Sequence, residues 1–367
     1  MLRITFACYR GTMNYTDRVC KALKQARVFN DSDGHNVTSI DISQDGSQVV
    51  TSSDGDEALR LYDSSTSGTL FKTLYAKKYG VSRVRFTHAP GTVVCTSRND
   101  WDHSLRYWSL HDNRYLRYFK GHRAEVVGLS VAPKDDFLLS ACAAGTCRLW
   151  DVRSDACSGF LRLPTKDARP CVSFDETGLT FAVAAAAPNR GGAIVSMFAT
   201  ADHDRGPFTQ SSKGDYMMTT PKAALATSIK FSSDGKHMIL AGGSDSCWVI
   251  DSFTAKCVSE YRLSCASSVI TDAAITPDCK YVIAGTLNEA SSDASGSLHI
   301  WPLISGDAGA VESGGPKVVT EEVAVHVGKH AGPVHAVLCS PVTLMVASAC
   351  KNLNLWLPDP AMLQSAS

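Results

Sequence analysis

A short motif recurs along this chain, and its clearest copy is Cys-Arg-Leu-Trp-Asp at residues 147–151. Each copy is an apolar stretch that follows a turn rich in Ser, Asp and Gly and ends on a large apolar residue. The end residues of the copies are Tyr62, Trp108, Trp150, Phe198, Ile250, Trp301 and Trp356. Successive end residues are 42 to 55 positions apart, so the chain consists of seven units of similar length.

The length of the repeat indicates the fold. A unit of this size with four short strands is typical of a blade of a β-propeller of the WD40 type. The third unit shows the pattern best, with apolar stretches at residues 126–131, 137–142 and 146–150. The sequence therefore predicts an all-β, seven-bladed WD40 propeller.

The two ends of the chain are expected to meet. The last unit meets Pro358 and Pro360 directly after its third strand and so lacks a fourth. Residues 26–29 read Ala-Arg-Val-Phe, precede the first unit and have no unit of their own. We expect them to supply the missing outer strand, which would close the ring and remove an open sheet edge. The predicted divisions are an N-terminal extension at 1–17, one propeller at 18–360 and a C-terminal tail at 361–367.

The first residues have two further interpretations. Residues 1–15 carry Arg3 and Arg10 and no acid, which is also the composition of a weak mitochondrial presequence. We favour a disordered extension, or translation that starts at Met13. The irregular stretch at 199–224 is predicted to include a long loop. Two inserts, at 288–296 and 305–316, lack the apolar content to pack.

Charge and cysteine content limit the classes of function. The chain has 36 Lys and Arg against 36 Asp and Glu. A formal net charge of zero predicts neither a membrane partner nor sequence-specific binding of nucleic acid. No apolar run reaches the roughly 18 residues of a membrane span. The 13 cysteines include no Cys-x-x-Cys pair and are expected to be reduced thiols of a cytosolic or nuclear protein.

Enzymatic motifs are absent from the sequence. It has no Gly-x-Gly-x-x-Gly, no Walker loop and no Gly-x-Ser-x-Gly. His326, His330 and His335 suggest a metal site, but no acid or Cys completes a ligand set at this spacing. We therefore expect no catalytic residues, no cofactor and no metal. A propeller enzyme stays open as an alternative that needs acids or histidines along the central channel.

Three units contain parts of a polar network that WD40 blades often share. In that network a turn Asp, a His before the first strand, a Ser or Thr and the strand Trp are hydrogen-bonded together. The third unit has His122, Ser140 and Trp150, with Ala144 in the Asp position. The seventh has His330, Ser348 and Trp356, with Cys350 for Asp, and the second has Asp102 and Trp108, with Lys77 for His. We expect these residues to satisfy buried polar groups and to have no role in function.

Several stretches match a particular family. The clearest are Lys-Thr-Leu-Tyr-Ala-Lys-Lys-Tyr-Gly-Val at 72–81 and residues 107–122, which end in Arg-Tyr-Phe-Lys-Gly-His. Further matches lie at 148–154, 171–182, 204–208, 328–334 and 347–352. In these stretches the chain resembles the WD repeat-containing protein 82 family. The resemblance extends over residues 19–358 and is weak from 188 to 228 and in the two inserts.

The resemblance implies an adaptor and not a catalyst. Members of this family are nuclear subunits of the histone H3 lysine methyltransferase assembly called COMPASS. They also join assemblies in which protein phosphatase one and its nuclear targeting subunit PNUTS act on RNA polymerase II. They are described as recognising the phosphorylated C-terminal repeats of that polymerase. The implied partners are thus a PNUTS-like or Set-type scaffold subunit, indirectly the phosphatase, and the polymerase repeats. A substrate receptor of a ubiquitin ligase or a subunit for RNA 3′-end processing are the alternatives.

The candidate binding residues lie on loops that should emerge on one side of the ring. In a propeller blade, the loop before the first strand and the loop between strands two and three lie on the same face. These loops carry Lys77, Lys78, Tyr79, Arg98, His103, Lys120 and Arg123. Cationic donors beside an aromatic ring are suited to a phosphorylated peptide. Because exposed Lys and Arg are common on any surface, an ordinary solvated surface is the competing explanation.

Overall fold

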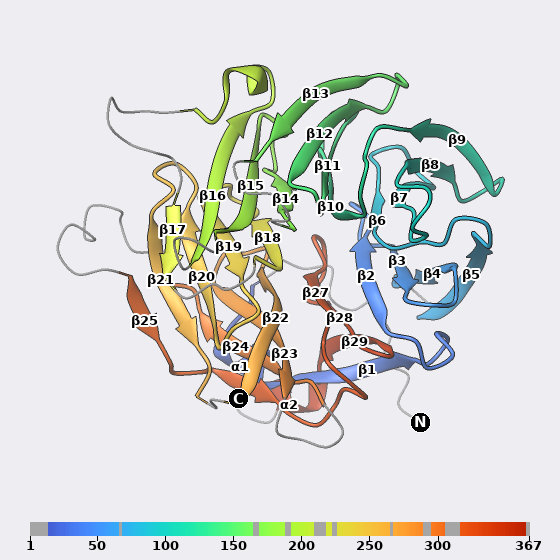
Figure 1. Ribbon diagram of the computed structural model, residues 1–367. Helices are drawn as coiled ribbons and strands as arrows, with labels where there is room; N and C mark the ends of the chain where they lie inside the picture. Colours follow the sequence, from blue (N-terminus) through green and yellow to red (C-terminus); the bar gives the residue numbers. More distant parts are fainter. Residues whose placement is uncertain are drawn as a thin grey trace.

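The computed structural model describes residues 14–65, 68–163, 169–187, 192–208, 218–221, 226–264, 267–288, 295–304 and 316–364. Seven separate sheets stand around a ring, and the first strand of each blade faces the centre (Figure 1). The predicted all-β, seven-bladed propeller is confirmed. Two five-residue helices, α1 (Asp17–Lys21) and α2 (Pro360–Gln364), lie at the ends of the chain. Within the described ranges no helix is long and apolar enough to cross a membrane.

The first three blades follow the predicted pattern closely. Blade one contains β2 (Val37–Ile42), β3 (Gln48–Ser53), β4 (Ala58–Asp63) and β5 (Thr69–Tyr75). Blade two contains β6 (Val84–Phe86), β7 (Thr92–Thr96), β8 (Leu105–Ser109) and β9 (Arg114–Phe119). Blade three contains β10 (Val126–Val131), β11 (Phe137–Cys142), β12 (Thr146–Asp151) and β13 (Cys157–Arg162).

Blades four and six contain long connections between their own strands, after β16 and after β24. Blade four contains β14 (Cys171–Phe174), β15 (Thr180–Ala187), β16 (Gly192–Ala199) and β17 (Met218–Pro221). Blade five contains β18 (Ser228–Phe231), β19 (His237–Ala241), β20 (Ser246–Asp251) and β21 (Cys257–Arg262), with β25 (Lys317–Val319) as a fifth strand. Blade six contains β22 (Ser268–Ile275), β23 (Tyr281–Asn288), β24 (Leu298–Pro302) and β26 (Ala324–His326). Most of the predicted inserts, at 289–294 and 305–315, lie outside the described residues, as do 209–217 and 222–225 of the expected loop.

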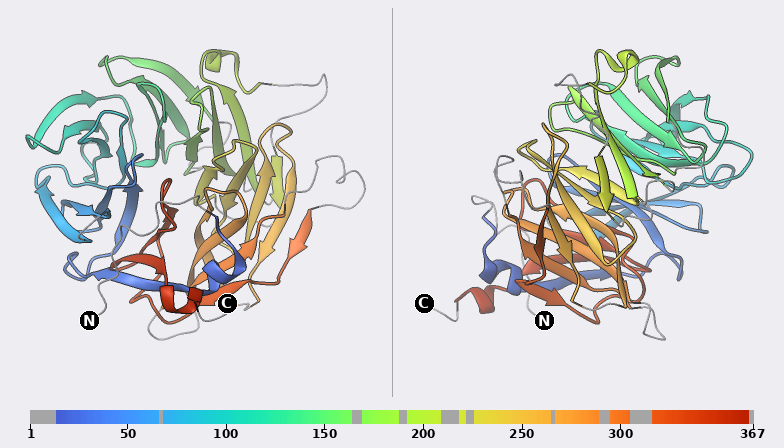
Figure 2. Two further views of the ribbon diagram at one scale, coloured as in Figure 1. Left: turned by 180° about the vertical axis from the view of Figure 1, so that it is seen from behind. Right: turned by 60° about the vertical axis from the view of Figure 1, so that its left-hand side comes forward.

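Blade seven joins the two ends of the chain, as predicted. It contains β27 (Ala336–Cys339), β28 (Val346–Ala349), β29 (Leu353–Pro358) and, on the outside, β1 (Leu23–Phe29). β1 runs antiparallel to β29, and the two strands lie side by side in Figures 1 and 2. The Phe29 ring packs against Tyr62 of blade one, with 4.6 Å between ring centroids. The terminal strand therefore also contacts the neighbouring blade.

The described part of the chain begins inside the predicted N-terminal extension. Tyr15 is fully buried, and its backbone N–H donates to the Asp278 carboxylate at 2.7 Å. The Tyr281 hydroxyl donates to Asp17 at 2.6 Å. Residues 14–17 therefore pack against blade six, while residues 1–13 of the predicted extension lie outside the described part. At the other end, α2 continues past the predicted boundary at residue 360.

The end residues of the repeated motif form the core between blades. Trp108, Trp150, Trp301 and Trp356 are at most 1% exposed. In blades one, two, three and five, the register between the third strand and the outer strand shifts at the end residue of the motif. One outer-strand residue is thereby left unpaired as a β-bulge. These bulge residues are Phe71, Leu116, Ser158 and Val258.

The polar networks of blades three and seven are present as predicted. The Ser140 hydroxyl lies 2.6 Å from His122 Nε2 and accepts the Trp150 indole N–H at 2.8 Å. The Ser348 hydroxyl lies 2.8 Å from His330 Nε2 and accepts the Trp356 indole N–H, also at 2.8 Å. Blade two differs from the expected arrangement, because the Trp108 indole donates to Asn113 and Asp102 pairs with an arginine. In every case the hydrogen bonds satisfy groups inside the blade.

Candidate peptide-binding face of blades two and three

The loop before β6 places Lys78 and Tyr79. The backbone N–H groups of Tyr79 and Gly80 both donate to the carbonyl of Ala76, at 2.9 and 2.8 Å. Gly80 has a φ of +65°, and a Cβ added there would lie 2.9 Å from Cβ of Arg98. Because only glycine adopts this conformation readily and leaves room for the neighbouring loop, the sequence Lys-Lys-Tyr-Gly fits this turn.

The loop between β7 and β8 is fastened to that turn. The Arg98 backbone N–H donates to the Tyr79 carbonyl at 3.0 Å, and the Asn99 side-chain amide donates to the Lys78 carbonyl at 2.9 Å. Arg98, Lys77 and Lys78 are exposed to solvent. The structure thus brings together Lys77, Lys78, Tyr79 and Arg98, four of the seven residues predicted for this face.

A buried arginine supports the aromatic part of the face. The Arg106 guanidinium carbon lies 3.5 Å from the Tyr79 ring centroid and 5.8 Å from the centroids of Tyr115 and Tyr118. Its side chain is 1% exposed and donates to Asp102 at 2.5 Å. Burial acts to raise the pKa of Asp102, but hydrogen bonds from Ser104 and the charge of Arg106 outweigh it and hold that pKa below its ordinary value. Arg106 is therefore paired with Asp102 and stacked on the Tyr79 ring, and it holds that ring in position from the buried side.

Trp101 extends the aromatic surface and was not among the residues predicted for this face. Its side chain is 65% exposed and its ring centroid lies 5.7 Å from that of Tyr79. The Lys78 ammonium lies 5.1 Å from the Tyr79 centroid. A large aromatic residue within the polar loop at 98–103 was the signal that could have identified it. We call Lys78, Tyr79 and Trp101 the aromatic platform.

The remaining predicted residues lie toward blade three. His103 is half-buried and close enough to His122 for its charge to act on that ring. Burial, and then the charges of Arg148 and His103, lower the pKa of His122 to about 3, so this ring is neutral. Lys120 and Arg123 are exposed on the loop that leads into β10. The two residues extend the cationic rim of the face but are not part of the aromatic platform.

Comparison with known proteins places the chain in a family. The model of the WD domain, G-beta repeat, matches residues 24–63 and 113–151. The chain is 31% identical to WD repeat-containing protein 82 of Drosophila melanogaster over 343 residues, which is 93% of this chain and 96% of that protein. The chain belongs to the WD repeat-containing protein 82 family. It is also 34% identical to "Protein ANTHESIS POMOTING FACTOR 1" of Arabidopsis thaliana, over 94% of this chain and 93% of that protein. Identity to the Set1 complex component swd2 of Schizosaccharomyces pombe is 32%, over 69% of each chain.

Two of the three histidines considered for a metal site, His326 and His330, make structural side-chain contacts. His326 Nε2 lies 3.0 Å from the Cys20 carbonyl oxygen, which ties β26 to α1. His330 belongs to the blade-seven network with Ser348. Across the described ranges, no three His, Cys, Asp or Glu side chains are grouped so that they could hold a metal ion.

Charged residues line the central channel of the propeller. A hollow of about 530 Å³ opens among the first strands of the blades, lined in part by Asp41, Arg85 and Lys230. The Asp41 carboxylate accepts from the backbone N–H of Phe86 at 2.7 Å, and Lys230 donates to Asp272 at 2.7 Å. Burial raises the pKa of Asp41, although Arg85 opposes this effect. These charges join inner strands of different blades, which is a structural use of ionisable groups.

Proposed function

We propose that this protein is a non-catalytic WD40 scaffold subunit of a nuclear chromatin complex. Similarity to Set1 complex component swd2 and to WD repeat-containing protein 82 over most of the chain supports this role. The rigid ring of seven blades would hold a segment of a larger scaffold subunit, either a Set-type methyltransferase or a PNUTS-like protein. Protein phosphatase one would then be an indirect partner. A scaffold of this kind works by binding alone and needs no covalent step.

We further propose that the protein links its complex to the phosphorylated C-terminal repeats of RNA polymerase II. The observation that carries this proposal is the aromatic platform, in which an exposed Trp101 and a fixed Tyr79 lie beside Lys78. Phosphate favours cationic donors, whereas proline and tyrosine rings favour aromatic surfaces. Lys77, Arg98, His103, Lys120 and Arg123 would surround the peptide with positive charge. The platform therefore offers both kinds of contact within one face.

Binding of synthetic polymerase repeats, phosphorylated and unphosphorylated, tests the platform. By fluorescence anisotropy we expect Trp101→Ala and Lys78→Glu each to weaken binding of the phosphorylated peptide about tenfold or more, a loss of about 1.4 kcal/mol. Phe253→Ala and Lys134→Glu are matched controls, because both residues are exposed on turns at the opposite ends of the strands. Unchanged affinity in both platform variants would remove this face from the proposal.

Purification of the protein from nuclear extract tests the scaffold role. Co-purification with a Set-type methyltransferase or a phosphatase scaffold is the expected result. Recovery with a cullin adaptor would instead support a ubiquitin-ligase receptor. Recovery with RNA 3′-end cleavage factors alone would support an RNA-processing subunit. Either of these two outcomes contradicts the proposal even if the phosphopeptide binds.

A further inference from the structure

The outer edge of blade five is covered by another part of the same chain. β25 runs parallel to β21, and its residues pair with Ser259, Glu260 and Tyr261. Val319 of β25 is buried and packs in a cluster with Tyr261 and Trp301. The remaining pairs between strands of a blade are antiparallel, so β25 is an added strand that comes from outside the blade. An outer edge of this propeller can therefore accept an extended segment.

The outer edge of blade three is covered in a different way. A short 3-10 helix, η2 (His203–Arg205), brings the His203 ring against Gly159 of β13. A side chain at residue 159 would collide with this ring. The His203 ring is held in place by a contact of 2.9 Å between Nδ1 and the Thr200 carbonyl oxygen.

Blade two has the same local structure as blade five at its outer edge. The bulge residue is Leu116 in β9 and Val258 in β21. Phe119 lies three positions after the bulge of β9, and its ring centroid is 5.6 Å from that of Trp150 in the next blade. Tyr261 lies three positions after the bulge of β21, and its ring centroid is 5.9 Å from that of Trp301 in the next blade. Residues 117–119 of β9 are therefore equivalent to residues 259–261, which pair with β25.

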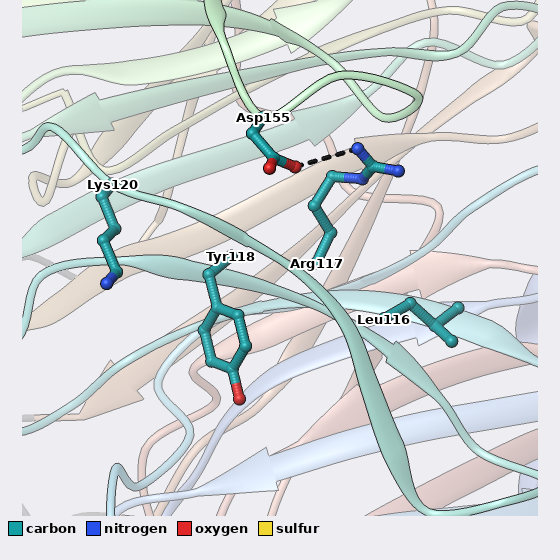
Figure 3. A pocket seen from close by; sticks show the side chains of 5 residues that line it. All are labelled: Leu116, Arg117, Tyr118, Lys120 and Asp155. Carbon is teal, nitrogen blue, oxygen red and sulfur yellow. Dashed lines mark hydrogen bonds and ion pairs between the residues drawn. The ribbon is translucent and has the colours of Figure 1, made fainter.

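On blade two this position is an open groove. The groove has a volume of about 550 Å³ and is lined by Leu116, Arg117, Tyr118, Lys120 and Asp155. Leu116 is 51% exposed and Tyr118 is 40% exposed. Arg117 points toward Asp155 while Tyr118 points the other way (Figure 3). Among the described residues β9 pairs only with β8, so it is an edge strand. We call this position the blade-two groove.

We propose that the blade-two groove binds an extended, acidic segment of a partner protein, which adds as a strand to β9 in the way that β25 adds to β21. Exposed apolar side chains on an edge strand favour addition of another strand. By analogy with blade five, the added strand should run parallel to β9 and pair with about three of its residues. It should carry an apolar residue opposite Phe119, just as Val319 lies opposite Tyr261 on blade five.

The charges of the two edges decide which segment fits. On blade five, Glu260 lies opposite Val318 next to Lys317, and Glu260 also accepts from Arg262. The equivalent residues on blade two are Tyr118 and Lys120, and Arg117 replaces Ser259. Blade two therefore has Tyr118 in place of the acid and an additional cation, Arg117, in place of Ser259, so residues 114–120 carry cations and no acid. The Arg117 guanidinium lies 2.9 Å from the Asp155 carboxylate, and the Asp155 side chain is largely exposed to solvent. Because an exposed ion pair adds little to stability, an acidic residue of a bound segment could take the place of Asp155 at a small cost in free energy.

This inference does not depend on the aromatic platform. Lys120 lies on both the groove and the cationic rim, but the groove otherwise follows the outer strand of blade two, whereas Trp101 and Lys78 lie on loops at the ends of the strands. Loss of phosphopeptide binding in Trp101→Ala would leave the groove intact. Equally, a groove variant that loses its partner segment would still bind the phosphorylated peptide. Failure of one proposal can therefore be distinguished from failure of the other.

Hydrogen–deuterium exchange tests strand addition. Exchange is compared between the isolated protein and the complex purified from cells with this protein as bait. We expect amides within 114–119 to be slowed about tenfold or more in the complex, because an added strand hydrogen-bonds to the outward-facing groups of β9. The peptide that contains β26, the outer strand of blade six, is the internal reference. No slowing in β9 overturns the proposal.

A photo-crosslinking residue in place of Leu116 identifies the occupant in the same complex. The expected product is a segment with several Asp or Glu and at least one large apolar residue. That segment, made as a peptide, should bind the protein with an affinity that falls as salt concentration rises. Replacement of its acids by the corresponding amides should weaken binding about tenfold. Crosslinks to a basic or neutral segment, to RNA or to a second copy of this chain would each contradict the proposal.

Paired variants separate the groove from general stability. The double variant Leu116→Glu with Arg117→Glu should bind the acidic peptide at least about tenfold more weakly and keep its unfolding midpoint, since both residues lie on the surface. Arg117→Lys should retain binding. Val325→Glu, on the exposed face of β26, is the matched control and should bind like the wild type. Equal binding by the double variant and by this control would overturn the proposal.

Discussion

The Arg106 guanidinium stacks on the Tyr79 ring at 3.5 Å, and this contact connects the core of blade two with its exposed face. Arg106 comes from strand β8, where its side chain is buried, while Tyr79 comes from a loop that precedes the blade. Asp102 and Ser97 hold the other side of the guanidinium. A buried ion pair thus determines the position of an aromatic ring on the surface.

Replacement of Arg106 by Met should destabilise the protein. The variant keeps apolar volume but leaves Asp102 without its cation and removes the stacking contact with Tyr79. We expect a loss of about 2–4 kcal/mol in the free energy of unfolding, measured by urea denaturation. Arg98→Met is the control, because that side chain is exposed, and its effect should stay within about 0.5 kcal/mol. A loss below about 1 kcal/mol for Arg106→Met would show that the buried pair is unimportant for stability.

Trp101 should dominate quenching of tryptophan fluorescence. The chain has six tryptophans, and the other five, Trp108, Trp150, Trp248, Trp301 and Trp356, are at most 1% exposed. Acrylamide should therefore quench mainly one residue, and Trp101→Phe should abolish most of the quenching without lowering stability. The same residue then reports peptide binding, because a phosphopeptide on the platform would shield it from acrylamide. Strong quenching that persists in Trp101→Phe would contradict the structure.

Stability should fall as the solution becomes acidic, because two buried histidines resist protonation in the folded state. Burial lowers the pKa of His122 to about 3 and that of His330 to about 4. The unfolded chain takes up these protons near pH 6.5, so the contribution of the two histidines to stability is constant above that pH and decreases below it. Each histidine adds a slope of up to about 1.4 kcal/mol per pH unit between 6.5 and its folded pKa.

His122→Asn tests this assignment. The variant should be less stable at pH 7, since Ser140 loses its hydrogen bond with His122 and Trp150 loses a ring contact, but its stability should depend less steeply on pH between 6.5 and 4. His111→Asn is the control, because the side chain of His111 is 93% exposed. Parallel pH profiles of the wild type and His122→Asn, measured by urea denaturation, would refute the role of this histidine.

Truncation at the N-terminus tests ring closure. A chain that starts at Asn14 keeps α1, β1 and the buried Tyr15, and we expect it to unfold at the same urea concentration as the full chain. A chain that starts at Asn30 loses β1 and exposes the edge of β29, so we expect aggregation on purification. Size-exclusion chromatography distinguishes the two results. A monomeric, folded product from the shorter chain would show that β1 is dispensable.

The interface proposals rest on features that the sequence showed only in part. Lys77, Lys78, Tyr79 and Arg98 could be assigned to one face because the order of strands in a repeating blade fixes which loops emerge together. Trp101 was missed because a single loop aromatic has no periodic signal. Arg106 looked like an ordinary strand residue, since the sequence does not reveal that a ring from another loop lies over it.

The sequence by itself determined the number of blades and the closure of the ring. The end residues from Tyr62 to Trp356 recur at a spacing of one blade, and each blade must bury the same face against its neighbour, so the periodicity survives in the primary structure. Only the tertiary structure decided that β25 covers blade five while β9 stays open. The stretch Lys317–Val319 is three residues long and pairs with residues more than fifty positions away. Such a contact depends on the path of the chain in space, and local sequence preference does not encode it.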